Sequence, residues 1–95
     1  MKVKVEEEHI FLGKKGDCHL CPIALALTDM GYDKVYVDAK FVDLKFQEKY
    51  FMGKLPESAK QFVCLFDLDA QTLAPFEFDL ELHDGDGVTL QRCIH

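Results

Sequence analysis

Two cysteines separated by two residues form the sharpest chemical feature of the chain, in the segment Cys18-His19-Leu20-Cys21-Pro22. Such a pair can supply two thiolates to a zinc ion, or act in redox chemistry where a helix N-terminus lowers a thiol pKa. Structural zinc needs two further ligands, and the other cysteines and histidines form no second pair at a metal-binding spacing. The third interpretation, which we favour, is a pair of small thiols that closes a helix cap. We therefore expect reduced cysteines, no metal and no cofactor.

The segment before this pair, Gly13-Lys14-Lys15-Gly16-Asp17, has the composition of an anion-binding loop. Two lysines between glycines, followed by the N–H groups of a helix start, combine cations, flexible backbone and a positive dipole end. A phosphate is the ligand type that accepts several such N–H groups at once. Asp17 would repel an anion unless its carboxylate caps the loop. Two interpretations stay open, a solvated turn and a ligand site formed by Lys14, Lys15, Gly16, Asp17, Cys18 and His19.

The sequence shows no catalytic pair. The histidines at positions 9, 19, 83 and 95 are scattered, and only His19 stands beside a nucleophile, Cys18, that it could activate. Each histidine is more simply explained as a surface residue. We expect a protein without enzymatic activity, and a small thiol-redox or cyclic-nucleotide-cleaving enzyme remains the alternative.

The charge distribution excludes some partner classes. Residues 1–66 hold ten lysines and ten acids, whereas residues 67–95 hold seven acids and one base, Arg92, and so carry the whole net charge of −6. Nucleic-acid binding needs basic surface, so DNA and RNA are not expected partners. No apolar run approaches the roughly 20 residues of a membrane span, and the first residues, Met1–Glu6, have no apolar stretch of a secretion signal. We expect a cytoplasmic protein without membrane contact.

Hydrophobic periodicity predicts the elements that must position these residues. Residues 2–6 alternate as a strand, and Pro22 suits the first turn of a short helix that ends at Gly31. Residues 34–38 and 41–46 read as strands, and residues 50–52 as a further short one.

The second half of the chain repeats this pattern. Pro56 opens a second helix that ends near Asp67, and residues 76–82 alternate as a strand. Residues 88–93 are expected to return as its hairpin partner after a turn at residues 84–87. The order predicts an α+β fold: one domain over residues 1–95, with a largely antiparallel sheet of four to six strands and two helices on one face. The predicted shared core contains Phe62, Phe66, Phe76 and Phe78.

Six segments stand in a recognisable order: K-V-K-V, E-H-I-x-x-G, D-C-H-x-C-P-I-A-L-A, V-Y-V, L-P-x-x-A-x-x-F-V-x-x-F-D and P-F-E-F-x-L. In these segments the chain resembles a group of small phage and bacterial proteins. The resemblance covers most of the chain up to about residue 82 and leaves out residues 84–95. It implies a phage-type accessory protein made in the cytoplasm of a bacterial host, and it implies no particular chemistry.

These observations lead to two main functional hypotheses. The first is a binding module that sequesters a small anionic, nucleotide-like ligand, such as a bacterial immune signal, in a pocket completed by homo-oligomerisation. The lysine loop and the small size of the domain motivate it. The second is an inhibitor whose acidic C-terminal hairpin docks on a basic surface of a host defence protein or nuclease.

Overall fold

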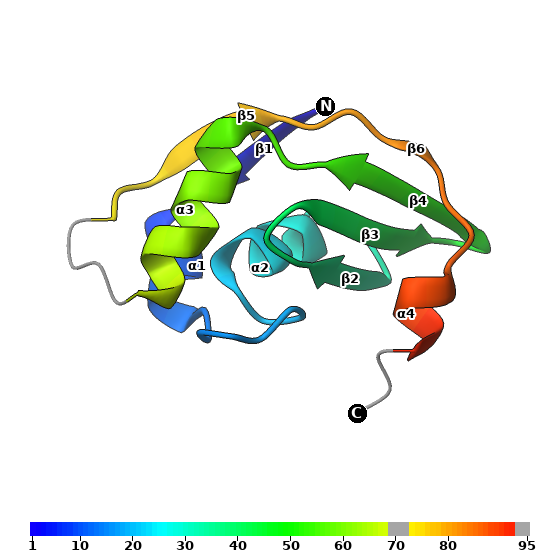
Figure 1. Cartoon of the computed structure of the whole chain (residues 1–95), viewed down its shortest axis with the longest axis horizontal. Coiled ribbons are helices and arrows are strands. Elements are labelled where there is room, and N and C mark those ends of the chain that lie inside the picture. The colour runs from blue at the N-terminus through cyan, green and yellow to red at the C-terminus, as the bar shows by residue number, and fades with distance from the viewer. Residues whose placement is uncertain (69–72, 93–95) are drawn as a thin grey trace.

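The computed structural model describes residues 1–68 and 73–92, and over these ranges the chain forms four helices and six strands (Figure 1). In chain order they are β1 (Lys2–Val5), α1 (Glu7–Leu12), α2 (Pro22–Asp29), β2 (Lys34–Val37), β3 (Phe41–Phe46), β4 (Lys49–Lys54), α3 (Glu57–Asp67), β5 (Phe76–Asp79), β6 (His83–Asp84) and α4 (Val88–Arg92). The α+β class is confirmed. None of the helices in the described ranges is long and apolar enough to cross a membrane.

The strands form two antiparallel sheets. One has the order β2-β3-β4-β6, and the other pairs β1 with β5 so that Val3 lies opposite Phe78. The segment from β5 to β6 links them, because it pairs with β1 along its first part and with β4 at its end (Figure 1). The N–H of Leu80 donates to the carbonyl of Met1 at 2.7 Å, and the Met1 amino group donates to the Leu80 carbonyl at 3.1 Å. The strand predicted over residues 76–82 is therefore shorter in the structure: it ends with β5 at Asp79, and the next strand, β6, begins at His83 in the other sheet.

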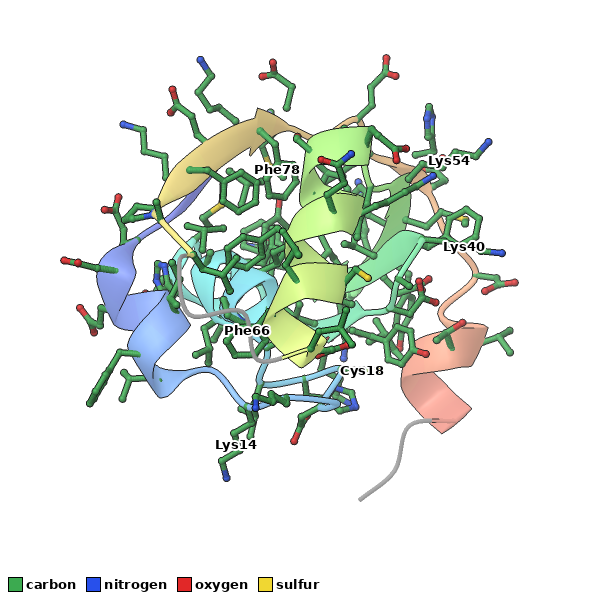
Figure 2. All side chains as sticks on the ribbon, turned by 60° about the vertical axis from the view of Figure 1, so that its left-hand side comes forward. Lys14, Cys18, Lys40, Lys54, Phe66 and Phe78 are labelled. Atoms are coloured by element: carbon green, nitrogen blue, oxygen red, sulfur yellow. The ribbon has the colours of Figure 1, made fainter. Side chains whose placement is uncertain are left out.

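The phenylalanine core is confirmed. The α3 helix buries Phe62 and Phe66, β5 buries Phe78, and Phe76 packs against the same cluster. Neighbouring rings stack: Phe62 and Phe76 have centroids 4.6 Å apart, and Phe76 and Phe78 have centroids 5.6 Å apart. Figure 2 shows Phe66 and Phe78 on the inner side of α3 and β5. Apolar side chains at helical spacing in α3 thus meet the inward side of an alternating strand.

A short helix follows β1, in a stretch for which the sequence pattern predicted no helix or strand. The α1 helix begins after Glu6, whose backbone N–H donates to Nδ1 of His9 at 2.9 Å. This hydrogen bond is the returning half of a capping box, in which the third residue of the helix reaches back to the cap. The E-x-x-H spacing is the signal that the sequence carried for this helix.

The predicted hairpin strand over residues 88–93 is wrong, because Val88–Arg92 forms the helix α4. The Asp86 carboxylate accepts the N–H of Val88 at 2.9 Å, as an N-terminal helix cap does. Gly87 adopts a positive φ of 73° directly before the helix. Leu90 anchors α4 to the rest of the protein, because its side chain is buried and only 5% exposed. The cap at Asp86 and the burial of Leu90 therefore favour a helix more strongly than the alternating sequence pattern favours a strand.

Candidate functional site

The loop between α1 and α2 is closed by Asp17. One carboxylate oxygen of Asp17, Oδ1, accepts the N–H groups of His19 at 2.9 Å and Leu20 at 3.1 Å. Its carbonyl accepts the N–H of Cys21 at 3.0 Å, and the N–H of Lys14 donates to the carbonyl of Leu20 at 2.8 Å. Asp17 therefore caps the loop. From the sequence, this capping role was the condition under which the Asp17 carboxylate would not repel an anion bound at the loop.

A second carboxylate reaches the same loop from α3. The N–H of Gly16 donates to Oδ1 of Asp67 at 3.2 Å, across 51 residues of sequence. The side chains of Lys14 and Lys15 are exposed, and Figure 2 shows Lys14 extending into solvent. Of the backbone donors proposed for a phosphate, the one at Gly16 is thus engaged by the protein's own carboxylate, while the two lysines face outward.

The start of α2 is buried, and Cys21 is its N-cap residue with Pro22 in the first position. Burial raises the pKa of the Cys21 thiol to about 11, although the N–H groups of Ala24 and Ile23 point to the sulfur and act in the opposite direction. At neutral pH Cys21 is therefore a protonated thiol, as expected for a cap residue. The helix dipole does not make it a reactive thiolate.

The raised pKa of Cys21 makes the folding stability of the protein depend on pH in a definite direction. The pKa of Cys21 is higher in the folded chain than its ordinary value of 9.0. The folded state therefore favours the neutral thiol, and the contribution of this group to stability is complete below about pH 9 and is lost as pH rises toward 11.

The C-x-x-C loop also covers the edge of the four-stranded sheet. The N–H of Val37 in β2 donates to the carbonyl of Cys18 at 2.8 Å. Nδ1 of His19 lies 2.8 Å from the carbonyl of Val35, an acceptor, so Nδ1 carries the proton. The His19 ring also meets Tyr36 edge-on, with centroids 5.9 Å apart. The loop thereby satisfies backbone groups that an open edge strand would leave to solvent or to another chain.

His9 links α1 to α2. Its Nε2 lies 2.6 Å from Oδ2 of Asp29, while its Nδ1 accepts the N–H of Glu6. The proton of the neutral ring is therefore on Nε2 and is donated to Asp29. A histidine with both nitrogens engaged in this way holds two helices together and has no nitrogen left for proton transfer to a substrate.

A surface pocket with a volume of about 490 Å³ lies beside this loop. Two of the predicted site residues, Asp17 and His19, line it. Leu20 of the same loop also lines it, together with Asp33, Lys34 and Leu90 from other parts of the chain. The lining contains two carboxylates and one lysine, so the pocket has an acidic balance and combines hydrogen-bond acceptors with apolar side chains.

A smaller pocket of about 250 Å³ also has Asp17 in its lining and lies beside the C-terminal part of α3, which contributes Val63 and Asp67. We call it the cysteine pocket, because Cys18 and Cys21 both line it, together with Gly16, Asp17, Asp38 and Asp67. Within the described ranges, no group of three or more histidine, cysteine or acidic side chains converges as a metal centre. The residues that the structure describes therefore form no four-ligand zinc site around this pair.

The two pockets divide the six predicted site residues. Asp17 and His19 line the larger one, and Gly16, Asp17 and Cys18 line the smaller one. Lys14 and Lys15 line neither. Sequence reasoning missed Asp33, Lys34 and Leu90, because no local pattern indicates that they approach the loop, and it missed the reach of Asp67.

The rate of thiol modification should differ between the exposed and the buried cysteine. At pH 8 we expect iodoacetamide to modify Cys64, which is exposed on α3, while Cys21 stays unmodified because it is buried and protonated. Peptide mass spectrometry after timed quenching measures both positions. Equal rates at the two residues would contradict the buried cap, and a denatured sample should show the difference disappear.

Comparison with known proteins adds no relative. No protein-family model, curated protein or solved structure matches the chain.

Proposed function

We propose that the protein binds and sequesters a small nucleotide-like ligand, whose nucleoside part enters the 490 Å³ pocket and whose anionic part faces exposed lysines. The observation that carries this proposal is the pocket itself, which combines acidic acceptors with the apolar side chains of Leu20 and Leu90 beside the predicted loop. Its volume is within the range of about 300–1,000 Å³ that is usual for small-ligand sites.

The charges of the pocket favour this orientation of the ligand. The Asp17 and Asp33 carboxylates would repel a phosphate inside the pocket, but they can accept hydrogen bonds from the amino or imino groups of a nucleobase. Lys34 lines the same pocket, and Lys14 and Lys15 are exposed on the adjoining loop. These three lysines would supply the positive charge for a phosphate, and their charges make binding sensitive to salt.

The hydrogen bonds of His9 and His19 support ligand binding without catalysis. His9 uses both nitrogens in hydrogen bonds between elements, and Nδ1 of His19 is held by β2. We therefore favour sequestration over catalysis. The phage-type context implied by the sequence resemblance makes nucleotide signals of bacterial immunity, in the host cytoplasm, the first ligands to test.

Calorimetry against nucleosides, nucleotides, cyclic nucleotides and inorganic phosphate tests this function. We expect one nucleotide to bind more tightly than its nucleoside, and Lys14→Ala/Lys15→Ala to weaken it at least about tenfold, because charge-assisted hydrogen bonds are lost. Native mass spectrometry of the same samples reports ligand mass and homo-oligomeric state together.

A charge-matched control is available on the chain. Figure 2 shows Lys40 and Lys54 on the side of the molecule away from Lys14, so Lys40→Ala/Lys54→Ala removes the same charge at a distance. Equal weakening by both double variants would mean nonspecific attraction and would contradict the site. Absence of binding by every ligand of the panel would reject the function.

One observation favours a second candidate, docking of an acidic face on a basic protein surface. Burial raises the pKa of the Asp43 carboxyl, and the charges of Asp38 and Asp86 raise it further. Asp86, from the segment after β6, therefore lies close enough to the β2–β3 region to build an acidic face of these three residues. An oligolysine peptide is the probe: binding should weaken with salt and with Asp38→Asn/Asp43→Asn, but not with Asp79→Asn/Glu81→Gln.

The same carboxylates predict a stabilising substitution. Because the pKa of Asp43 is raised in the folded chain, the folded state binds its proton more readily than the unfolded state, and stability falls as pH rises through this group. Asp43→Asn should therefore raise the melting temperature at pH 7, with the gain vanishing below about pH 3.8, the ordinary pKa. Thermal unfolding at both pH values measures this. A variant that melts below the wild type at pH 7 would mean that the carboxylate makes favourable contacts.

A further inference from the structure

We propose that the cysteine pocket binds one soft monovalent metal ion, of the Cu(I) class, between the sulfur atoms of Cys18 and Cys21. The sequence alone favours a pair of cysteines that binds no metal. The observation that favours a metal ion is that Cys18 and Cys21 line the same pocket. This site is separate from the nucleotide pocket, with which it shares only Asp17 as a lining residue.

The backbone brings the two cysteines to one side of a single turn. The carbonyl of Asp17 accepts the N–H groups of Leu20 at 3.3 Å and Cys21 at 3.0 Å, so the chain winds once between Asp17 and Cys21. Residues three apart in a helical turn have Cβ atoms about 5–6 Å apart. Cys18 and Cys21 are both thiols and both line the pocket, so the proposed site takes its two sulfur ligands from one turn of the chain.

The charges around the pocket favour a cation. Asp17, Asp38 and Asp67 line it, and none of the described residues that line it is a lysine or an arginine. Each carboxylate also accepts backbone N–H groups through its Oδ1: Asp17 from His19, Asp38 from Phe41 at 2.6 Å and Asp67 from Gly16. The three acids therefore supply negative potential while they are held in structural hydrogen bonds.

The number of ligands selects the class of metal. Structural zinc takes four ligands, and no three-residue group forms a metal centre in the described part of the chain. Thiolates are soft ligands that prefer Cu(I), and a monovalent ion of this kind is satisfied by two of them. Oxygen-preferring ions such as Mg²⁺ and Ca²⁺ do not match a pair of sulfur atoms.

Binding exchanges two protons for the metal ion. Each thiol loses its proton to solvent and forms one sulfur–metal bond, so no electron is transferred and no oxidant is needed.

Competition with a chromophoric Cu(I) chelator, bicinchoninate, tests the site under anaerobic, reducing conditions. The measurement uses a Cys64→Ser/Cys93→Ser background, in which Cys18 and Cys21 are the remaining thiols. We expect one Cu(I) per chain, and a further Cys18→Ser or Cys21→Ser change should weaken binding more than about 100-fold, beyond the effect of altering a neighbour of a ligand. Serine is a good N-cap residue, so Cys21→Ser should keep the helix start.

Each outcome bears on the proposal. One Cu(I) per chain in the background variant, with two sulfur neighbours by X-ray absorption, supports it. A background variant that binds no Cu(I), single serine variants that bind as tightly as the background, or a preference for Zn²⁺ over Cu(I) would overturn it. Circular dichroism of every variant separates loss of the ligand from loss of the fold, and nucleotide binding is scored independently because it requires neither thiol.

Discussion

Replacing Phe66 with alanine should destabilise the protein by about 3–5 kcal/mol. The Phe66 ring is 9% exposed and stacks on Phe62 with centroids 6.3 Å apart, and Phe62 continues the stack to Phe76. Removing it leaves a cavity in the core that the neighbouring rings can fill only in part. A domain of this size has about 5–15 kcal/mol of stability, so the loss is a large share of the total. Urea denaturation followed by circular dichroism measures it.

The neighbouring residue provides the control. Leu65 lies on the same turn of α3 but is 46% exposed, so Leu65→Ala should cost less than about 1 kcal/mol. A Phe66→Ala variant with the wild-type denaturation midpoint, or equal losses at both positions, would show that the buried face of α3 is misassigned.

The second large effect is expected at Gly53, where β4 passes the segment between β5 and β6. A Cβ atom at this position would lie 2.5 Å from the carbonyl oxygen of Glu81 and 3.1 Å from Cδ1 of Leu80. The first contact is with backbone, so the two segments must move apart. Gly53→Ala should therefore cost about 1–3 kcal/mol, the usual range for overpacking, and should loosen the pairing of Met52 with His83.

Two measurements together check this prediction. Thermal unfolding should show a lower melting temperature, and amide hydrogen exchange should accelerate at His83 more than in the β2–β3 pair, which is formed by other residues. Met52→Ala is the matched control, because the Met52 side chain is exposed and its truncation leaves the backbone in place. If Gly53→Ala melts like Met52→Ala, β4 and the segment at Glu81 are not in close contact.

The local sequence determined most of the elements. Pro22 and Pro56 marked the starts of α2 and α3, because a fixed φ and a missing N–H suit the first turn of a helix. The alternation over residues 76–82 correctly placed Phe78 and Leu80 inside, since successive side chains of an extended chain point to opposite sides. The α+β class followed from this order of elements.

Short segments were harder to predict from sequence. The α1 helix depends on the side chain of His9, which holds Glu6 at one nitrogen and Asp29 at the other, 20 residues further along. The α4 helix depends on the cap at Asp86 and on a space for Leu90, although residues 88–93 alternate as a strand would. Segments of five or six residues have little propensity of their own, so packing decides their conformation.

In the candidate site, too, some features follow from the local sequence and others only from the tertiary structure. The sequence by itself determined which groups the α1–α2 loop contains: two lysines, an aspartate that can cap it, and two thiols three residues apart. Tertiary structure alone decided what surrounds them, because it brought Asp67 to Gly16, the edge of β2 to His19, and Asp33, Lys34 and Leu90 to the larger pocket. Cap and turn hydrogen bonds are local and leave a pattern in the sequence, whereas the charge and shape of a pocket arise from residues far apart in the chain.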